Sequence, residues 1–172
     1  YGHKTGGGAY NHNSNTSYAL QYPTRAIYAQ YKALLLDPAD AKFSFGGKDS
    51  DDIWVFNINR ARIKEKLDPG NWEIRLRGTA ANGGKTIKLI DDSLQGTNPY
   101  GSVDSPVQGG RVYNVMSGTI ELPDDDPNFA VPTGSTKYGL VYPDLRIVVL
   151  SPSAISGAIN LSPETGSASG QV

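Results

Sequence analysis

Residues 49–78 read DSDDIWVFNINRARIKEKLDPGNWEIRLRG, and residues 85–93 read KTIKLIDDS. Between residues 72 and 77, apolar Trp, Ile and Leu alternate with charged residues, which is the period-two pattern of a half-buried strand. The Asn82-Gly83 pair in the gap tolerates positive φ and predicts a hairpin turn. These stretches therefore predict a strand at residues 53–58, a short helix at 60–67, and a hairpin of strands at 72–77 and 86–90.

The apolar run at residues 53–58 is almost continuous, so we expect this strand to be buried on both faces, with a helix over one of them. That helix is predicted at residues 25–36, where apolar residues recur at spacings of three and four. Thr24 is the expected N-cap. Asp37-Pro38 ends the helix, because proline cannot continue the hydrogen-bond ladder.

The rest of the chain predicts short strands separated by turns. It contains 20 Gly and 11 Pro, which favours a loop-rich β protein. Gly46-Gly47 predicts a turn, and the acidic, proline-bearing residues 123–135 predict a surface loop. The predicted fold class is mainly β with one or two short α-helices (α+β), as an antiparallel sheet or sandwich with an extended N-terminal arm. Further strands are expected at residues 43–45, 111–116, 119–122, 138–142 and 145–150.

The two ends of the chain differ in composition from its middle. Residues 1–22 are rich in Gly, Asn and Tyr and predict an extended N-terminal arm, and residues 153–172 resemble an extended tail or linker. Residues 23–152 are expected to form a single globular β-rich domain. The chain starts at Tyr1 and has a single Met, so we expect a processed form or a part of a longer polypeptide.

Composition excludes several classes of function. Sixteen basic and 17 acidic residues give a formal charge of −1, which offers no electrostatic attraction for nucleic acid or for an anionic membrane. The absence of cysteine excludes a disulfide, a thiolate metal site and a cysteine nucleophile. No apolar run approaches the roughly 18 residues that a membrane-spanning helix needs. We therefore predict neither nucleic acid nor a membrane as a partner.

No residue pattern meets the requirements of a catalytic centre. Both histidines, His3 and His12, lie in the predicted arm, whereas the base of a catalytic triad needs a rigid partner that orients it. Gly83-Gly84-Lys85-Thr86 imitates the end of a phosphate-binding loop, but a strand is predicted where that loop requires a helix. We therefore predict no catalytic residues, no enzyme activity and no cofactor. A hydrolase fragment remains a hypothesis, which requires carboxylates with perturbed pKa values clustered in a cleft.

Three acidic clusters, at residues 49–52, 91–92 and 124–126, are candidates for a calcium site. None has the Asp-x-Asp-x-Asp-Gly spacing that turns alternate side chains toward one ion. We therefore interpret the clusters as solvated turns and caps, and predict no metal site.

Four segments of the chain read TRAIYAQYKALLL, DDIWVFNINRARIKEKLDPGNWEIRL, KTIKLIDDS and YGLVYPDLRIVVLSP. Together they resemble a family of virion structural proteins, tail or baseplate components of contractile-tailed bacteriophages. The resemblance covers residues 18–152. It implies a non-enzymatic role in a symmetric homo- or hetero-oligomer with other virion proteins, located in the phage tail and assembled in the host cytoplasm.

The arm and the first helix carry the residues that we expect to contact neighbouring subunits. Tyrosines bring a large amphipathic area at low rotamer entropy, and ordering an arm requires contacts with a neighbour. A place in the core is the alternative for Tyr28 and Tyr31. The predicted contact residues are Tyr18, Tyr22, Arg25, Tyr28 and Tyr31.

The alternative function is a carbohydrate- or receptor-binding β-sandwich module of a fibre or adhesin. Such a module stacks exposed Trp and Tyr rings on sugars. Trp54 and Trp72 lie in apolar strand patterns, so we expect both to be buried, which disfavours this alternative.

Overall fold

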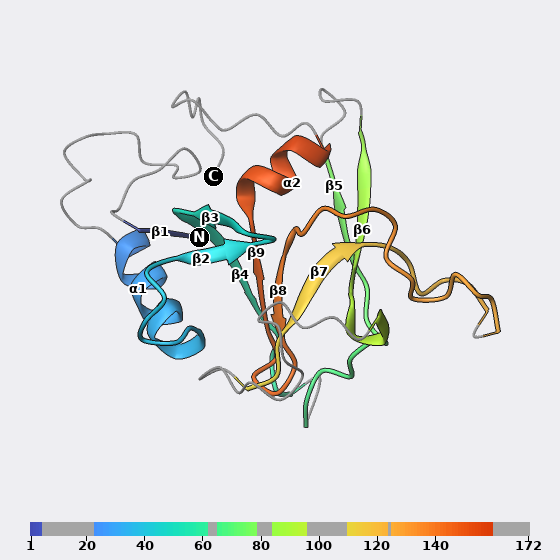
Figure 1. The fold of residues 1–172 in the computed structure, drawn as a ribbon, viewed down its shortest axis with the longest axis horizontal. Coiled ribbons are helices and arrows are strands. Elements are labelled where there is room, and N and C mark those ends of the chain that lie inside the picture. Colours follow the sequence, from blue (N-terminus) through green and yellow to red (C-terminus); the bar gives the residue numbers. More distant parts are fainter. Residues whose placement is uncertain (5–22, 62–64, 79–83, 96–109, 124, 160–172) are drawn as a thin grey trace.

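The computed structural model describes residues 1–4, 23–61, 65–78, 84–95, 110–123 and 125–159 (Figure 1). Its main element is a seven-stranded antiparallel sheet with the strand order β1-β4-β9-β8-β7-β6-β5, and β2 and β3 form a separate hairpin. Only two short α-helices occur in these residues, so the predicted mainly β fold class is confirmed. The elements are β1 (Gly2–His3), α1 (Pro23–Leu35), β2 (Phe43–Phe45), β3 (Lys48–Ser50), β4 (Asp52–Asn57), β5 (Ile74–Arg77), β6 (Thr86–Asp91), the 3₁₀ turn η3 (Ser93–Gln95), β7 (Tyr113–Ser117), β8 (Gly139–Tyr142), β9 (Ile147–Leu150) and α2 (Pro152–Ile159).

Strands β5 to β9 form an uninterrupted meander. Each of them pairs with the next strand in the chain, and β9 finally pairs with β4, which precedes them all. The chain thus crosses from β4 to the far edge of the sheet and returns strand by strand. Helix α2 contacts both β4 and β6, which β9, β8 and β7 separate in the sheet. The sheet is therefore curled around α2.

Helix α1 and the β2–β3 hairpin cover the other face of the sheet (Figure 1). Tyr28 of α1 packs its ring edge-on against Phe43, with 5.5 Å between the ring centroids. Its hydroxyl donates a hydrogen bond to Ser50 O (2.8 Å) and accepts one from the backbone N–H of Phe43 (3.1 Å). Tyr28 therefore ties α1 to both strands of the hairpin. The buried residues of this cluster are Tyr28, Leu35, Leu36, Phe43, Phe45, Ile53, Val112, Leu140, Tyr142, Ile147 and Val149.

A second apolar cluster lies between α2 and the sheet. Side chains of a strand point alternately to its two faces, so Val148 and Leu150 of β9 face α2 while Ile147 and Val149 face α1. All four are buried, as expected for a central strand that is covered on both sides. The buried residues of this second cluster are Leu67, Trp72, Ile87, Leu89, Val115, Val141, Val148, Leu150, Ile155 and Ile159.

The predicted strands are confirmed with small shifts of their bounds, with one exception. Residues 119–122 form no strand, because the chain leaves the sheet after Ser117. The burial of β4 on both faces is confirmed only in part, since Ile53 is fully buried while Phe56 is 38% exposed. The turn at Gly46-Gly47 is confirmed, and both glycines have positive φ.

Helix α1 is confirmed, but it begins at Pro23, so Thr24 lies in its first turn rather than at the N-cap. The helix predicted at residues 60–67 is wrong for the residues that are described, which form turns and irregular chain on either side of residues 62–64. Asn59 accepts a hydrogen bond from the N–H of Ala61 at 2.9 Å, and the N–H of Leu67 donates to Pro143 O at 3.0 Å. The first bond is one that an N-cap residue would also make, but the second takes an N–H that a helix would bond to the carbonyl four residues earlier.

The predicted tail is also wrong in its first part, because residues 153–159 belong to α2. Ile155 and Ile159 are 0% and 2% exposed, and Ser151 accepts a hydrogen bond from the N–H of Ala154 at 3.4 Å at the start of the helix. Residues 160–172 lie outside the described residues. So do residues 5–22 of the predicted arm, whereas residues 2–3 form β1 and pair with β4.

Ile155→Ala is expected to lower the free energy of unfolding by about 2–5 kcal/mol, because it leaves a cavity between α2 and the sheet. Gly157→Ala on the same helix is the control. A Cβ at this position meets no atom within 4 Å, so we expect a gain of about 0.5–1 kcal/mol from helix propensity. Urea denaturation measures the change in the free energy of unfolding for both variants. A negligible change for Ile155→Ala would contradict the packing of α2 against the sheet.

Candidate functional site

Residues 118–133 form a loop between β7 and β8 that projects from the sheet on the side away from α1 (Figure 1). Its two ends are joined by backbone hydrogen bonds. The N–H of Thr133 donates to Ser117 O at 2.7 Å, and the N–H of Ala130 donates to Thr119 O at 3.2 Å. The surface loop predicted at residues 123–135 is therefore confirmed, and it is closed at its base.

Gly118 holds the base of this loop against β6. Its N–H donates to Lys88 O at 3.1 Å. A Cβ at this position would lie 2.3 Å from Cδ1 of Ile90 and 3.2 Å from Val131 O. The first distance is shorter than any normal carbon contact, so a side chain at position 118 would displace the buried Ile90 side chain.

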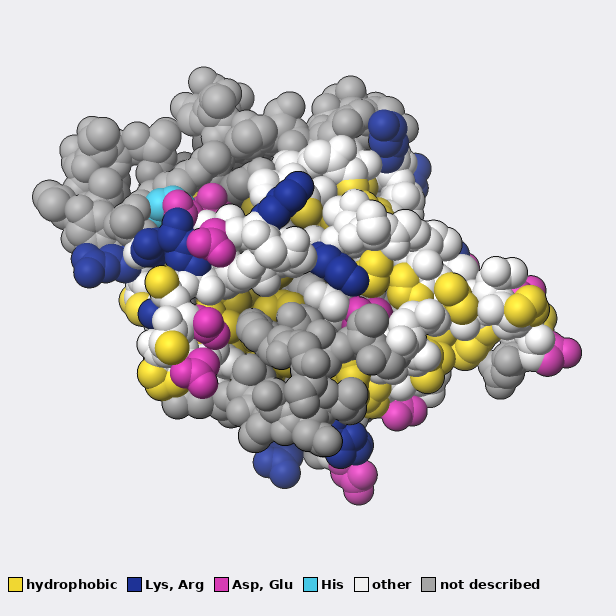
Figure 2. Space-filling model, viewed as in Figure 1, with side chains coloured by type: hydrophobic (Ala, Val, Ile, Leu, Met, Phe, Trp, Pro, Cys, Tyr) yellow, Lys and Arg dark blue, Asp and Glu magenta, His cyan; other side chains and the backbone are white. Residues whose placement is uncertain are grey.

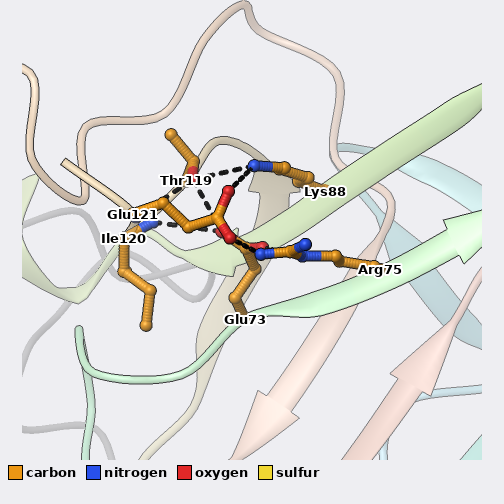
Figure 3. Close-up of polar contacts among 6 residues, drawn as sticks. All are labelled: Glu73, Arg75, Lys88, Thr119, Ile120 and Glu121. Atoms are coloured by element: carbon orange, nitrogen blue, oxygen red, sulfur yellow. Dashed lines mark hydrogen bonds and ion pairs between the residues drawn. The ribbon is translucent and has the colours of Figure 1, made fainter.

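Glu73, immediately before β5, is the central residue of a polar network at the base of the loop (Figure 3). Its Oε2 accepts hydrogen bonds from the Thr119 hydroxyl (2.7 Å) and from the backbone N–H of Ile120 (3.1 Å). Its Oε1 accepts a hydrogen bond from Arg75 Nε at 2.7 Å. The Glu73 side chain is only 7% exposed, so these three donors replace the water that it loses.

Glu121 in the loop completes the network by forming ion pairs with Arg75 and Lys88 (Figure 3). Arg75 and Lys88 are direct cross-strand partners on β5 and β6. Like charges in this arrangement repel each other. Glu121 brings a negative charge to both cations, so attachment of the loop relieves a repulsion that the β5–β6 hairpin has by itself.

Burial alone would raise the pKa of Glu73. The hydrogen bonds from Thr119, Arg75 and Ile120, together with the positive charge of Lys88, outweigh burial, so the pKa is lowered from its ordinary value. Glu73 is therefore ionised at neutral pH and acts as a hydrogen-bond acceptor.

This arrangement suits attachment of the loop better than proton transfer. A general acid needs a raised pKa, and the two carboxylates of a glycosidase need pKa values that are pushed apart. The pKa of Glu73 shifts the opposite way, and Glu121 is engaged by two cations. Within the described ranges of the chain, no group of three or more His, Asp or Glu residues could hold a metal ion.

Apolar side chains gather along the projecting loop. Figure 2 shows a row of hydrophobic side chains over this part of the molecule, with acidic side chains near its end. The large apolar side chains of the loop are half-buried, and partly exposed apolar side chains that lie in a row suit a contact surface. The half-buried or exposed apolar residues of the loop are Ile120, Leu122, Pro123, Pro127, Phe129, Val131 and Pro132.

A groove of about 420 Å³ lies between the β2–β3 hairpin, residues 135–137 and the start of α2. Its charged lining residues are Lys48, Asp49 and Lys137. The Lys137 ammonium lies 3.7 Å from Oδ2 of the buried Asp92, so its charge is compensated inside the protein. Lys48 and Asp49 are exposed and opposite in charge, so the groove provides no strong field for an ion.

Asp91 and Asp92 are buried, each 1% exposed, which corrects the prediction of a solvated turn. Asp91 accepts hydrogen bonds from the backbone N–H groups of Gly70 (2.9 Å) and Ser93 (2.9 Å). Asp92 accepts hydrogen bonds from the backbone N–H (2.9 Å) and the side-chain amide (2.7 Å) of Asn114. The pair therefore fastens the turn before β5, and strand β7, to the end of β6.

The structure does not gather the predicted contact residues on one described surface. Tyr18 and Tyr22 lie outside the described residues. Arg25 is exposed on α1, and Tyr31 is half-buried against the cluster under α1. Tyr28 is 2% exposed and its hydroxyl is bonded within the fold, so the core alternative applies to it.

The remaining candidates stay apart as well. His3 lies in β1, and His12 lies outside the described residues. The sequence Gly83-Gly84-Lys85-Thr86 resembles the end of a phosphate-binding loop, which would have to be followed by a helix. Strand β6 starts at Thr86 instead, as predicted. Trp72 is buried as predicted, whereas Trp54 is half-buried, contrary to the prediction, and neither of them lines the groove.

Sequence reasoning missed the Glu73 network, although its charges are visible in the alternating pattern of the hairpin. Which cations face each other depends on register. A two-residue turn at Asn82-Gly83 would pair Arg77 with Lys88. The structure instead pairs Arg77 with Thr86, which brings Arg75 opposite Lys88.

Comparisons of the chain with protein-family models, with curated proteins and with solved structures found no match in any of the three. The resemblance to phage virion proteins therefore stays a prediction, and the function is argued from geometry. Among the described residues, no helix combines the length and the apolar character needed to cross a membrane.

Glu73→Gln keeps the shape of the side chain but removes its charge, and we expect it to lower the free energy of unfolding by about 1–3 kcal/mol at neutral pH. Because the pKa of Glu73 is lowered, its contribution is fully present above the ordinary glutamate pKa of about 4.3. The contribution is lost as the pH falls through the lowered pKa, so the parent and the variant should converge in acid.

Urea denaturation across this pH range measures the difference, with Arg77→Gln as the control. Arg77 is an exposed charge on the same strand, and it lies outside the network that Figure 3 draws. A loss for Glu73→Gln that does not change with pH, or that is as small as that of the control, would contradict the assigned role.

Proposed function

We propose that this chain is a structural subunit that acts through contacts with other protein subunits, in the tail or baseplate of a bacteriophage virion. The projecting loop of residues 118–133 is the observation that carries the proposal. The resemblance of residues 18–152 to virion proteins supplies the phage context. In this proposal the chain joins copies of itself and other virion proteins in a symmetric oligomer, assembled in the host cytoplasm.

The loop combines two properties that suit a contact surface. It carries apolar side chains away from the sheet, and burying a Leu or Phe side chain in an interface is worth about 1.5–3 kcal/mol. It is also held at its base by Glu73, Glu121 and Gly118. A loop that is held in one conformation before binding loses less entropy when a partner covers it.

The edge of the sheet beside the loop offers a second kind of contact. In the described part of the chain, β5 pairs with β6 on one side, and no strand pairs with its outer side. The free backbone groups of an edge strand can bind a strand of a neighbour. Arg75 is already paired with Glu73 and Glu121, whereas Arg77 is an exposed charge on β5, so a neighbouring strand with an acidic residue opposite Arg77 fits this edge best.

The double variant Leu122→Ser/Phe129→Ser is expected to weaken association between copies of the chain by about tenfold or more. Each substitution removes an apolar side chain of the loop, and about 1.4 kcal/mol corresponds to a factor of ten in affinity. Sedimentation equilibrium of the purified chain over a range of concentrations measures the association constant.

Leu94→Ser is the matched control, because Leu94 is also an exposed apolar residue but lies on η3, away from the loop and from β4. Its effect on association is expected to be small. A chain that stays monomeric at every concentration, or an association that the loop variant does not change, would overturn the proposal.

A further inference from the structure

Residues 1–4 occupy a slot between the edge strand β4 and helix α1 (Figure 1). Gly2 pairs with Ile53 and His3 pairs with Asp52, in antiparallel register. The N–H of Lys4 adds a hydrogen bond to Asp51 O at 2.8 Å. This short segment therefore extends the sheet by one strand beyond β4.

The slot is so narrow at Gly2 that it accepts only glycine there. A Cβ on Gly2 would lie 2.9 Å from the backbone N of Tyr28 and 3.1 Å from Cγ1 of Ile53. Gly2 is buried, and Ile53 beneath it is fully buried. The inserted strand thus completes the cover of the core between α1 and β4.

Asp52 adds polar recognition of the residues on either side of Gly2. Its carboxylate accepts a hydrogen bond from the Tyr1 hydroxyl, and His3 Nε2 lies 3.9 Å from Asp52 Oδ1. The glycine requirement and this carboxylate together make the slot selective for the sequence Tyr-Gly-His, and the backbone pairing adds affinity.

We propose that this slot is an exchange site, in which residues 1–4 of one copy of the chain pair with β4 of a second copy. All the contacts described above are the same whether the strand belongs to the same chain or to a neighbour. Residues 5–22 connect Lys4 to α1, and 18 residues can span at most about 60 Å, so the covalent connection permits either arrangement.

Exchange competes with the internal arrangement where many copies are packed side by side. A tether gives a segment an effective concentration on the order of millimolar at its own slot, and copies that touch in an assembly reach a similar range. The inference rests on the proposed function because it needs neighbouring copies. It uses the edge of the sheet at β4, and not the loop of residues 118–133.

Two single-cysteine variants test the exchange, because the chain has no cysteine of its own. His3→Cys and Asp52→Cys replace cross-strand partners whose side chains approach each other, which suits a disulfide. They give up the contacts of the Asp52 carboxylate, but the backbone pairing and the fit of Gly2 remain to guide the strand. The two variants are unfolded together, refolded together at high concentration and oxidised. We expect a disulfide-linked heterodimer that joins position 3 of one chain to position 52 of the other, identified by mass spectrometry of the linked peptides.

Two controls separate exchange from random collision. Lys48→Cys replaces Asp52→Cys in the first control, since Lys48 is exposed on β3 and does not pair with β1. Gly2→Val is added to the His3→Cys chain in the second control, because the new side chain would clash with Tyr28. We expect both to reduce the heterodimer severalfold or more.

A yield of the heterodimer equal to either control would overturn the exchange. So would a chain carrying both His3→Cys and Asp52→Cys that forms only an internal bridge and stays monomeric. If the heterodimer fails to form while Leu122→Ser/Phe129→Ser still weakens association, the exchange is refuted and the proposed function is still supported. If the parent chain is monomeric throughout, both fall.

Discussion

The antiparallel pairing of β4 with β9 joins the two parts of this chain, and the rest of the structure depends on it. Residues 54–57 pair with residues 147–150, which lie far away in the sequence. The side chains of β9 are all buried, and they alternate between the cluster under α1 and the cluster under α2. The same strand therefore supports both helices. Without it, β1 and β4 would have no strand pairing with the meander among the described residues.

The two ends of the sheet are completed in different ways, and both bear on assembly. At one end, residues 1–4 fill the slot beside β4 and bury Ile53. At the other end, Glu73 and Glu121 attach the projecting loop to the β5–β6 hairpin, where two cations would otherwise repel each other. In the proposed assembly, contact surfaces at separate ends of one sheet would let a subunit join more than one neighbour.

Two short segments show why local patterns predicted part of the fold and failed elsewhere. Residues 60–67 contain more helix-favouring side chains than residues 153–159, yet residues 153–159 are helical and the described residues of 60–67 are not. Ile155 and Ile159, four positions apart, lie on one face of a helix and are buried together against the sheet. In residues 60–67, the N–H of Leu67 instead donates a hydrogen bond to Pro143 O. Burial and distant hydrogen bonds outweigh helix propensity in segments this short.

The candidate sites follow the same division between local and distant contacts. The alternation around Trp72 and the near-continuous apolar run of β9 are local, and strands could be predicted from them. The burial of Asp91 and Asp92 could not be predicted in this way. Their hydrogen-bond donors belong to Gly70 and Asn114, which are distant in the sequence. An acidic pair looks the same in the sequence whether water or backbone N–H groups surround it.

By itself, the sequence determined the strand periodicity, the first helix and the mainly β class, since each depends on side chains only a few residues apart. The tertiary structure alone decided the register of the β5–β6 hairpin and the partners of its charges. A shift of two residues returns every side chain to the same face, so the apolar pattern is equally satisfied by either register. The two registers differ in how they place the charges. Only the observed register sets Arg75 opposite Lys88, where Glu121 can form an ion pair with both.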